Sequence, residues 1–374
     1  MMSSITKNQH YVSQCITREF ANDKEKLFEA LLDYQKVIAT NCRDSMAESF
    51  TYEHSALKSN TLEHFFGRYE SEMGVVLIEL KNKLFQYEMD RDNLNEIRVL
   101  AEKHMKKFIL FYYKSGALLH EYQFQLKEKE DRIPFLLSKI SDSRYLDELC
   151  KTITHYYHFA VIKSKEKEFL LSDQFMSTAA LSIKGMFTNS TNRNIGLKDI
   201  VILIPISSEY YLIYYDGKVP FDIVKEEFNE LTKEQIEVIN TVINNNSYKK
   251  TVGLKREPLE RALDQFEYKS PVGTIMGFKS GKTRGATIKK EVFFTKETEE
   301  LWETFRGHLW SKHYKKIERN IPCYCGSGRK LKNCCIDTVT ILRDTMRISF
   351  LARSNRNLIT VHPKALVEKA VVEV

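Results

Sequence analysis

Four cysteines within thirteen residues near the C-terminus constrain the fold of their region more than any other feature of the chain. They have the spacing C-x-C-x8-C-C and are Cys323, Cys325, Cys334 and Cys335. Zinc takes four thiolates in a tetrahedron, and such a closed set makes a structural site rather than a catalytic one. The chain between the two pairs must reverse direction, and Gly326 and Gly328 permit that turn. The sequence therefore predicts a zinc knuckle; the alternative is four reduced cysteines without metal.

The residues around these cysteines resemble a known motif. Arg319-Asn320-Ile321-Pro322 precedes the first pair, and three basic residues between the pairs offset the charge of a zinc tetrathiolate. The stretch from Arg319 to Cys335 is similar to the SEC-C motif, which is found at the C-terminus of the SecA translocation motor and in many other bacterial proteins. The resemblance implies a zinc-binding docking element, because the SecA knuckle docks on partners.

Composition excludes some classes of protein. The chain has 374 residues, of which 43% are hydrophobic and 29% charged, a balance typical of soluble globular domains. No apolar run approaches the roughly 18 residues of a membrane span, and residues 1–7 lack the apolar core of a signal peptide. The other cysteines, Cys15, Cys42 and Cys150, are scattered and odd in number. We therefore expect a cytoplasmic protein with reduced thiols and no membrane association.

The net charge of +7 is unevenly distributed. Residues 249–335 hold 20 Lys and Arg against 10 Asp and Glu, so all of the excess positive charge lies there. A basic surface of this kind attracts nucleic acid, a ribosome or an acidic protein; the alternative is a solvated face without a partner. The candidate binding residues are Lys279, Lys282, Arg284, Lys289, Lys290, Arg329, Lys330 and Lys332.

One stretch of this basic segment is similar to the end of a phosphate-binding loop. Gly281-Lys282-Thr283 matches the last residues of that motif, but Met276 stands where its first glycine is required. No buried strand precedes the stretch in the predicted pattern. We therefore expect a basic, flexible loop and no nucleotide site.

The first 250 residues resemble an uncharacterised bacterial family, domain of unknown function 4238. The resemblance rests on Asn8-Gln9-His10-Tyr11-Val12, on Ser49-Phe50-Thr51-Tyr52-Glu53, on a Leu-Glu pair at the start of a helix, and on Ser172-Asp173 after a strand. Ser13 stands where the family usually has proline, which indicates a different entry turn. Asn60 or Thr61 is expected to cap the helix that contains Glu63.

Hydrophobic periodicity outlines the remaining elements. Helices are predicted at residues 60–84, 92–113, 141–157, 232–245 and 298–314, and a further one at 339–351. Hairpins are predicted from 159–162 with 169–171, and from 201–206 with 210–215; residues 358–361 are read as a short strand. The apolar runs lack alternation, so both faces of the sheet should be covered by helices.

The predicted fold class is α+β, a helix-rich domain packed on a small mixed or antiparallel sheet, with a C-terminal zinc knuckle. The expected divisions are a main domain over 1–250, a basic segment over 251–318, the knuckle over 319–338 and a tail over 339–374. The sequence indicates no oligomeric state.

Four polar residues are candidates for catalysis: His10, Glu63, Glu70 and Asp173. Glu63 and Glu70 are seven residues apart and share one helix face. A histidine with carboxylates suffices for metal-assisted phosphodiester hydrolysis, with His10 as general base or ligand. The alternative is a buried polar network that fixes the N-terminal segment. Whether the protein is an enzyme stays open, and a nuclease in bacterial stress or phage defence is a hypothesis beside the docking one.

Overall fold

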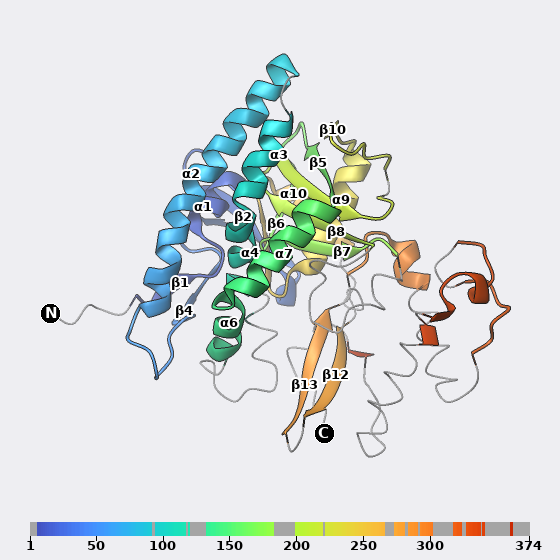
Figure 1. The fold of residues 1–374 in the computed structure, drawn as a ribbon. Helices are drawn as coiled ribbons and strands as arrows, with labels where there is room; N and C mark the ends of the chain where they lie inside the picture. Colours follow the sequence, from blue (N-terminus) through green and yellow to red (C-terminus); the bar gives the residue numbers. More distant parts are fainter. Residues whose placement is uncertain are drawn as a thin grey trace. The chain divides into compact units, whose positions relative to one another are not determined.

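Figure 1 shows the computed structural model of the chain. It describes residues 6–91, 94–116, 119, 132–182, 199–219, 221–265, 273–280, 283–290, 292–301, 317–323, 327–337, 339–340 and 360–361. The fold is α+β, as predicted, and divides into two compact units. The first comprises residues 1–177, 202–215 and 220–266, and the second comprises 178–201, 216–219 and 267–374. No helix in the described ranges is long and apolar enough to cross a membrane.

The helices of the first unit include those predicted at 60–84, 92–113, 141–157 and 232–245, and three that the sequence analysis did not predict, at 14–17, 133–140 and 256–264. They are α1 (Gln14–Thr17), α2 (Thr61–Asp90), α3 (Leu94–Lys103), α4 (Met105–Lys114), α6 (Ile133–Ile140), α7 (Ser143–Tyr156), α9 (Lys233–Asn246) and α10 (Arg256–Asp264). The helix predicted at 92–113 is two helices, because the chain breaks at His104. Thr232 and Gln235 form a reciprocal capping box that begins α9.

Two sheets and one short strand pair are formed by strands between residues 8 and 253. A five-stranded sheet has the order β10 (Phe228–Glu230), β5 (His158–Lys163), β9 (Tyr210–Asp216), β8 (Ile200–Pro205) and β7 (Ser177–Ala180). A four-stranded sheet has the order β3 (Lys36–Asn41), β2 (Lys26–Leu31), β11 (Lys250–Gly253) and β6 (Leu171–Ser172). β1 (Asn8–His10) pairs with β4 (Ala47–Ser49).

Burial confirms one strand expectation, and strand pairing corrects another. Every residue of β8 is buried, as are all but the last of β9, which agrees with strands covered on both faces. β8 and β9 are neighbours, as the hairpin prediction requires. The hairpin predicted from 159–162 and 169–171 is wrong. β5 pairs with β9 and β10, whereas β6 pairs with β11 in the other sheet.

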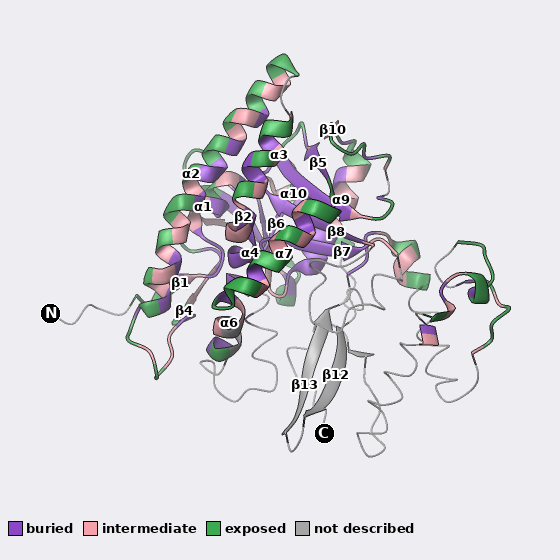
Figure 2. Cartoon of the chain, in the orientation of Figure 1, coloured by how far each residue is buried: buried purple, intermediate pink, exposed green. Residues whose placement is uncertain are grey.

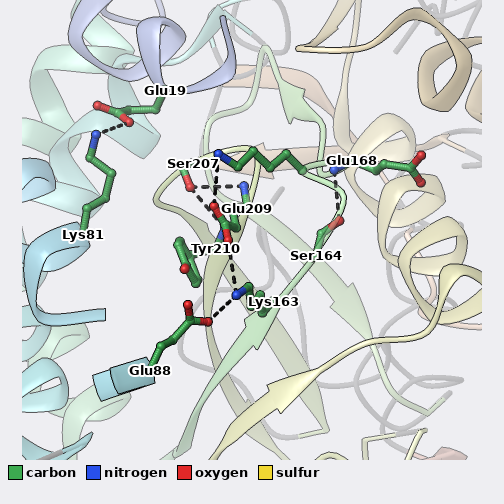
Figure 3. Close-up of polar contacts among 10 residues, drawn as sticks. Glu19, Lys81, Glu88, Lys163, Ser164, Glu168, Ser207, Glu209 and Tyr210 are labelled. Carbon is green, nitrogen blue, oxygen red and sulfur yellow. Dashed lines mark hydrogen bonds and ion pairs between the residues drawn. The ribbon is translucent and has the colours of Figure 1, made fainter. Parts of the chain in front are cut away.

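The long helix α2 is anchored at both ends by polar contacts. At its start Asn60 has a left-handed backbone, and its side chain accepts a bond from the Thr6 amide rather than capping the helix. The predicted side-chain cap is therefore absent. Near its end, Glu88 forms an ion pair with Lys163 of β5, and Lys163 also contacts Glu209 between β8 and β9 at 3.3 Å. Figure 3 shows this cluster, including the ion pair between Lys81 and Glu19.

In the second unit, the basic segment contains a hairpin instead of the flexible loop expected from its glycines. β12 (Gly273–Ser280) pairs antiparallel with β13 (Thr283–Lys290), and β14 (Thr360–Val361) adds to the other edge of β12. β14 confirms part of the strand predicted at 358–361. The helices predicted at 298–314 and 339–351 lie mostly outside the described residues.

Candidate functional site

A cavity of about 600 Å³ lies between the N-terminal segment and α2, and it collects three of the four catalytic candidates. Its lining includes His10 from the end of β1 together with Glu63 and Glu70 from α2. The two glutamates are two helical turns apart, so both side chains project from the same face of α2. The packing of the N-terminal segment against α2 brings His10 and the two glutamates, which are distant from it in sequence, to one cavity.

Buried hydrogen bonds hold β1 in place beside the start of α2. Gln9 is fully buried; its amide nitrogen donates to Glu53 Oε1 at 2.9 Å, and its amide oxygen accepts from the Tyr52 backbone at 2.7 Å. Glu53 Oε1 also accepts a hydrogen bond from the backbone N–H of Asn60 at 3.2 Å. These bonds join residues next to His10, and they hold the end of β1 beside the cavity.

His10 is held as a neutral base. Its Nε2 lies 3.0 Å from the carbonyl oxygen of Arg43, and because a carbonyl only accepts, Nε2 carries the proton and Nδ1 carries the lone pair. Burial lowers the pKa of His10, and the charge of Lys114 lowers it further, against the opposing effect of the Arg43 carbonyl. A neutral imidazole with a defined tautomer is the form that accepts a proton from a substrate or water.

Glu70 is held as a carboxylate by a buried lysine. Its Oε1 accepts a bond from Lys114 Nζ and another from Ser13 Oγ at 2.7 Å, and Lys114 Nζ also donates to Ser13 Oγ at 3.0 Å. Burial acts to raise the pKa of Glu70, but the charge and hydrogen bond of Lys114 and the bond from Ser13 outweigh it, so the net pKa is lowered. Glu70 therefore stays ionised at neutral pH.

Glu63 has the opposite electrostatic environment. Burial raises its pKa, opposed by the charge of Lys114, while the neighbouring charges of Glu70 and Glu53 raise it further. One helix face thus presents one carboxyl group whose pKa is raised and another whose pKa is lowered. Such a split is the arrangement that separates a general acid from a base.

The sequence analysis did not identify Cys15, Arg18 and Arg43, which also line the cavity, as site residues. Arg18 pairs with Glu25 at 2.9 Å, whereas the Arg43 guanidinium forms no hydrogen bond or ion pair within the described part of the chain. Burial raises the pKa of Cys15 to about 11, so it is a thiol and not a nucleophilic thiolate at neutral pH. No sequence pattern distinguishes the two arginines from the many other basic residues.

Asp173 does not line the cavity. It is fully buried after β6, and its carboxylate accepts three backbone N–H bonds, from Tyr248 at 3.0 Å, Lys249 at 2.8 Å and Lys250 at 3.1 Å. These bonds hold the turn that leads into β11. The structure therefore separates Asp173 from the cavity that His10, Glu63 and Glu70 line.

The cavity residues are also not arranged as a ready metal site. Among the described residues, the group of three or more potential ligands whose donor atoms all lie within 4.8 Å of one another is Cys323, Cys334 and Cys335. His10, Glu63 and Glu70 do not meet that spacing.

The cysteine cluster has the features of a metal centre. Residues 319–323 run back along 329–332, with the Cys323 amide donating to the Arg329 carbonyl at 2.7 Å. Gly328 has φ +70°, which makes glycine the favoured residue at this turn, as expected. Cys325 and Gly326 lie outside the described residues. The three described sulfurs are compatible with a metal ion, and one more ligand completes a tetrahedron.

Polar groups near the cluster favour thiolate sulfur. Arg329 donates from Nη2 to Cys334 Sγ at 3.4 Å, and Ser327 Oγ lies 3.3 Å from the same atom. Such bonds orient a ligand and stabilise its negative charge. Leu331 is fully buried, whereas Arg329, Lys330 and Lys332 are exposed.

The other basic candidates lie on or beside the hairpin. Lys279 and Arg284 are directly opposite each other, and Lys289 and Lys290 are paired with Thr274 and Gly273. Lys282 lies outside the described residues.

Two family models match the chain, and one curated protein is similar to part of it. The family model for proteins of unknown function called DUF4238 matches residues 8–257, and the SEC-C motif model matches residues 319–336. Protein translocase subunit SecA from Azobacteroides pseudotrichonymphae genomovar. CFP2 is 23% identical over 214 residues, covering 56% of this chain and 17% of SecA, so the chain spans only a small part of that relative. No solved structure matches. The chain therefore belongs to the DUF4238 family and carries a SEC-C motif near its C-terminus.

Proposed function

We propose that the protein is a cytoplasmic zinc-binding protein whose basic C-terminal region docks on nucleic acid. The observation that carries the proposal is the cluster of Cys323, Cys334 and Cys335, with Arg329 donating to one of its sulfurs. A structural zinc holds the short knuckle rigid, and its exposed basic residues then meet phosphates without a further ordering cost. The thiolates require a reducing compartment, which supports the cytoplasm.

The experiment is a salt titration of binding. Fluorescence anisotropy of the full chain with labelled RNA and DNA of mixed sequence should show affinity that falls steeply with salt, because bound counterions are released. The variant Lys289→Glu/Lys290→Glu should weaken binding equally for all sequences. Lys24→Glu/Lys26→Glu, at two exposed lysines of the first unit, is the matched control and should leave binding unchanged.

Two other results would replace this proposal. Recovery of a protein partner that resists nuclease treatment would identify an acidic protein, and recovery of ribosomal subunits would identify the ribosome. Binding that does not depend on salt contradicts docking through phosphates.

The cavity supports a second function, hydrolysis of a phosphodiester, because His10, Glu63 and Glu70 line one space. In this proposal His10 Nδ1 takes a proton from water as the water oxygen bonds to phosphorus. The bond to the leaving oxygen breaks, and the Glu63 carboxyl protonates that oxygen. Arg43 binds the phosphate, and Glu70 is held by Lys114 so that it orients the attacking water.

The test of this function uses purified full chain on fluorescent single- and double-stranded substrates. His10→Asn and Glu63→Gln should each reduce cleavage about 100-fold or more, as expected for loss of a general base or acid. Glu79→Gln, an exposed carboxylate farther along α2, is the control and should retain full activity. Cleavage that survives His10→Asn contradicts the role of His10 as the general base. A role in bacterial stress or phage defence requires this cleavage activity.

A further inference from the structure

The outer face of α2 carries an apolar stripe that nothing in the first unit covers. Val75, Ile78, Phe85 and Met89 are 65%, 56%, 62% and 72% exposed. Figure 2 shows exposed residues along this helix, and Figure 1 shows its C-terminal part reaching the end of the unit beside α3. A contiguous exposed apolar surface on a protein commonly marks an interaction site.

The spacing of the stripe is that of a coiled-coil seam. Val75, Ile78, Asn82, Phe85 and Met89 follow one another by three, four, three and four residues, which is the a–d pattern of a heptad repeat. The opposite face of α2 holds its own fully buried set: Met73, Val76, Leu77, Leu80 and Leu84. The helix thus has two apolar faces, and only one of them is used by its own chain.

We propose that α2 pairs in parallel with α2 of a second copy of this chain, through residues 75–89. Asn82 is exposed in the middle of the stripe, and it indicates both that the partner is a second copy of this chain and that the two helices are parallel. In a parallel pair the a positions face each other, so Asn82 meets Asn82 of the second copy and the two amides hydrogen-bond. In an antiparallel pair a faces d, and the amide of Asn82 would be buried against Ile78 without a partner.

Charges beside the stripe are compatible with this pairing. In a parallel pair, Lys81 lies beside Gln86 of the second copy and Gly74 lies beside Glu79, so no like charges meet. Lys81 is already paired with Glu19 of its own chain at 2.5 Å, and Glu88 with Lys163, as Figure 3 shows. Lys81 and Glu88 therefore interact within their own chain, and the apolar residues form the contact between the two helices.

The size of the stripe sets the strength of the pair. Four apolar side chains over about 21 Å of helix bury less than the roughly 800 Å² per partner of a standard interface. We therefore expect a dimer that dissociates on dilution. The proposed dimer is independent of the functions proposed for the cavity and for the basic segment.

Sedimentation velocity of the full chain from about 1 μM to about 100 μM tests the dimer. The wild type should pass from monomer to dimer, and Ile78→Glu/Phe85→Glu should stay monomeric with an unchanged circular dichroism spectrum. Tyr34→Glu/Tyr156→Glu places the same change at two other exposed apolar residues, 72% and 75% exposed, and should dimerise like the wild type. A wild type that is monomeric throughout, or a dimer that survives Ile78→Glu/Phe85→Glu, overturns the proposal.

The direction of pairing has its own test. Asn82→Cys should form a disulfide-linked dimer under mild oxidation, because equivalent residues face each other in a parallel pair. The wild type, treated in the same way, measures any cross-linking by the other cysteines. An Asn82→Cys dimer that does not cross-link above that level overturns the parallel arrangement.

Discussion

Lys114 at the end of α4 and Glu70 in the middle of α2 form an ion pair in which the lysine side chain is only 1% exposed. Lys114 Nζ also lies 5.3 Å from the centre of the Phe66 ring and 5.7 Å from that of Tyr52, so aromatic faces surround the charge. A buried lysine is costly without a partner. The pair therefore joins two helices and at the same time fixes the ionisation of a cavity residue.

The strength of this pair can be measured with a double-mutant cycle. We expect Lys114→Met and Glu70→Gln to show a coupling of about 2 kcal/mol in urea unfolding, because each single change leaves one group unpaired. The pair of Lys106 and Asp147, 41% and 51% exposed, is the control and should couple by less than about 1 kcal/mol. Equal coupling in the two cycles contradicts a buried role for Lys114.

Replacing a single cysteine of the cluster should remove the metal ion. Purified protein is expected to hold one zinc per chain by mass spectrometric metal analysis, and Cys334→Ser should lose it, because three ligands do not close the site. Cys150→Ser, outside the cluster, should keep it. The first unit has its own core, so its thermal transition should persist in Cys334→Ser. Freshly purified protein without zinc excludes the metal assignment.

His10 should make stability depend on pH. Burial lowers its pKa below the ordinary value of 6.5, so the unfolded chain binds more protons than the folded chain as pH falls through 6.5. The contribution of the neutral His10 ring to the free energy of unfolding is therefore complete above pH 6.5 and is lost at lower pH. His10→Gln should show a smaller decrease between about pH 8 and pH 5, measured by urea unfolding. The exposed His155→Gln should follow the wild type.

Asp173 should matter for stability and not for the cavity. Asp173→Asn replaces one acceptor oxygen with an N–H group facing backbone amides, and we expect a loss of about 2–4 kcal/mol. Asp23→Asn, at an exposed residue, should change stability by no more than about 0.5 kcal/mol. A cleavage defect in folded Asp173→Asn, with unchanged stability, would return this residue to the list of catalytic candidates.

Features that depend on a few consecutive residues could be predicted from the sequence. The knuckle follows from cysteine spacing and a glycine turn, and Gly328 has the left-handed backbone that this turn needs. β8 and β9 are joined by only four residues, so their pairing was also local information. The same holds for α7 and α9, whose periodicity identified them within two residues at each end.

Long-range packing decided the rest. β6 pairs with β11, about eighty residues later, rather than with nearby β5, because strand pairing depends on which edges the whole chain brings together. Arg43 reaches the cavity from the segment between β3 and β4, and Lys114 reaches Glu70 from α4. Sequence alone marked Asp173 and His10 as similar polar candidates. Only the tertiary structure separated them, because three backbone amides converge on Asp173, whereas His10 faces a cavity between segments that are distant in sequence.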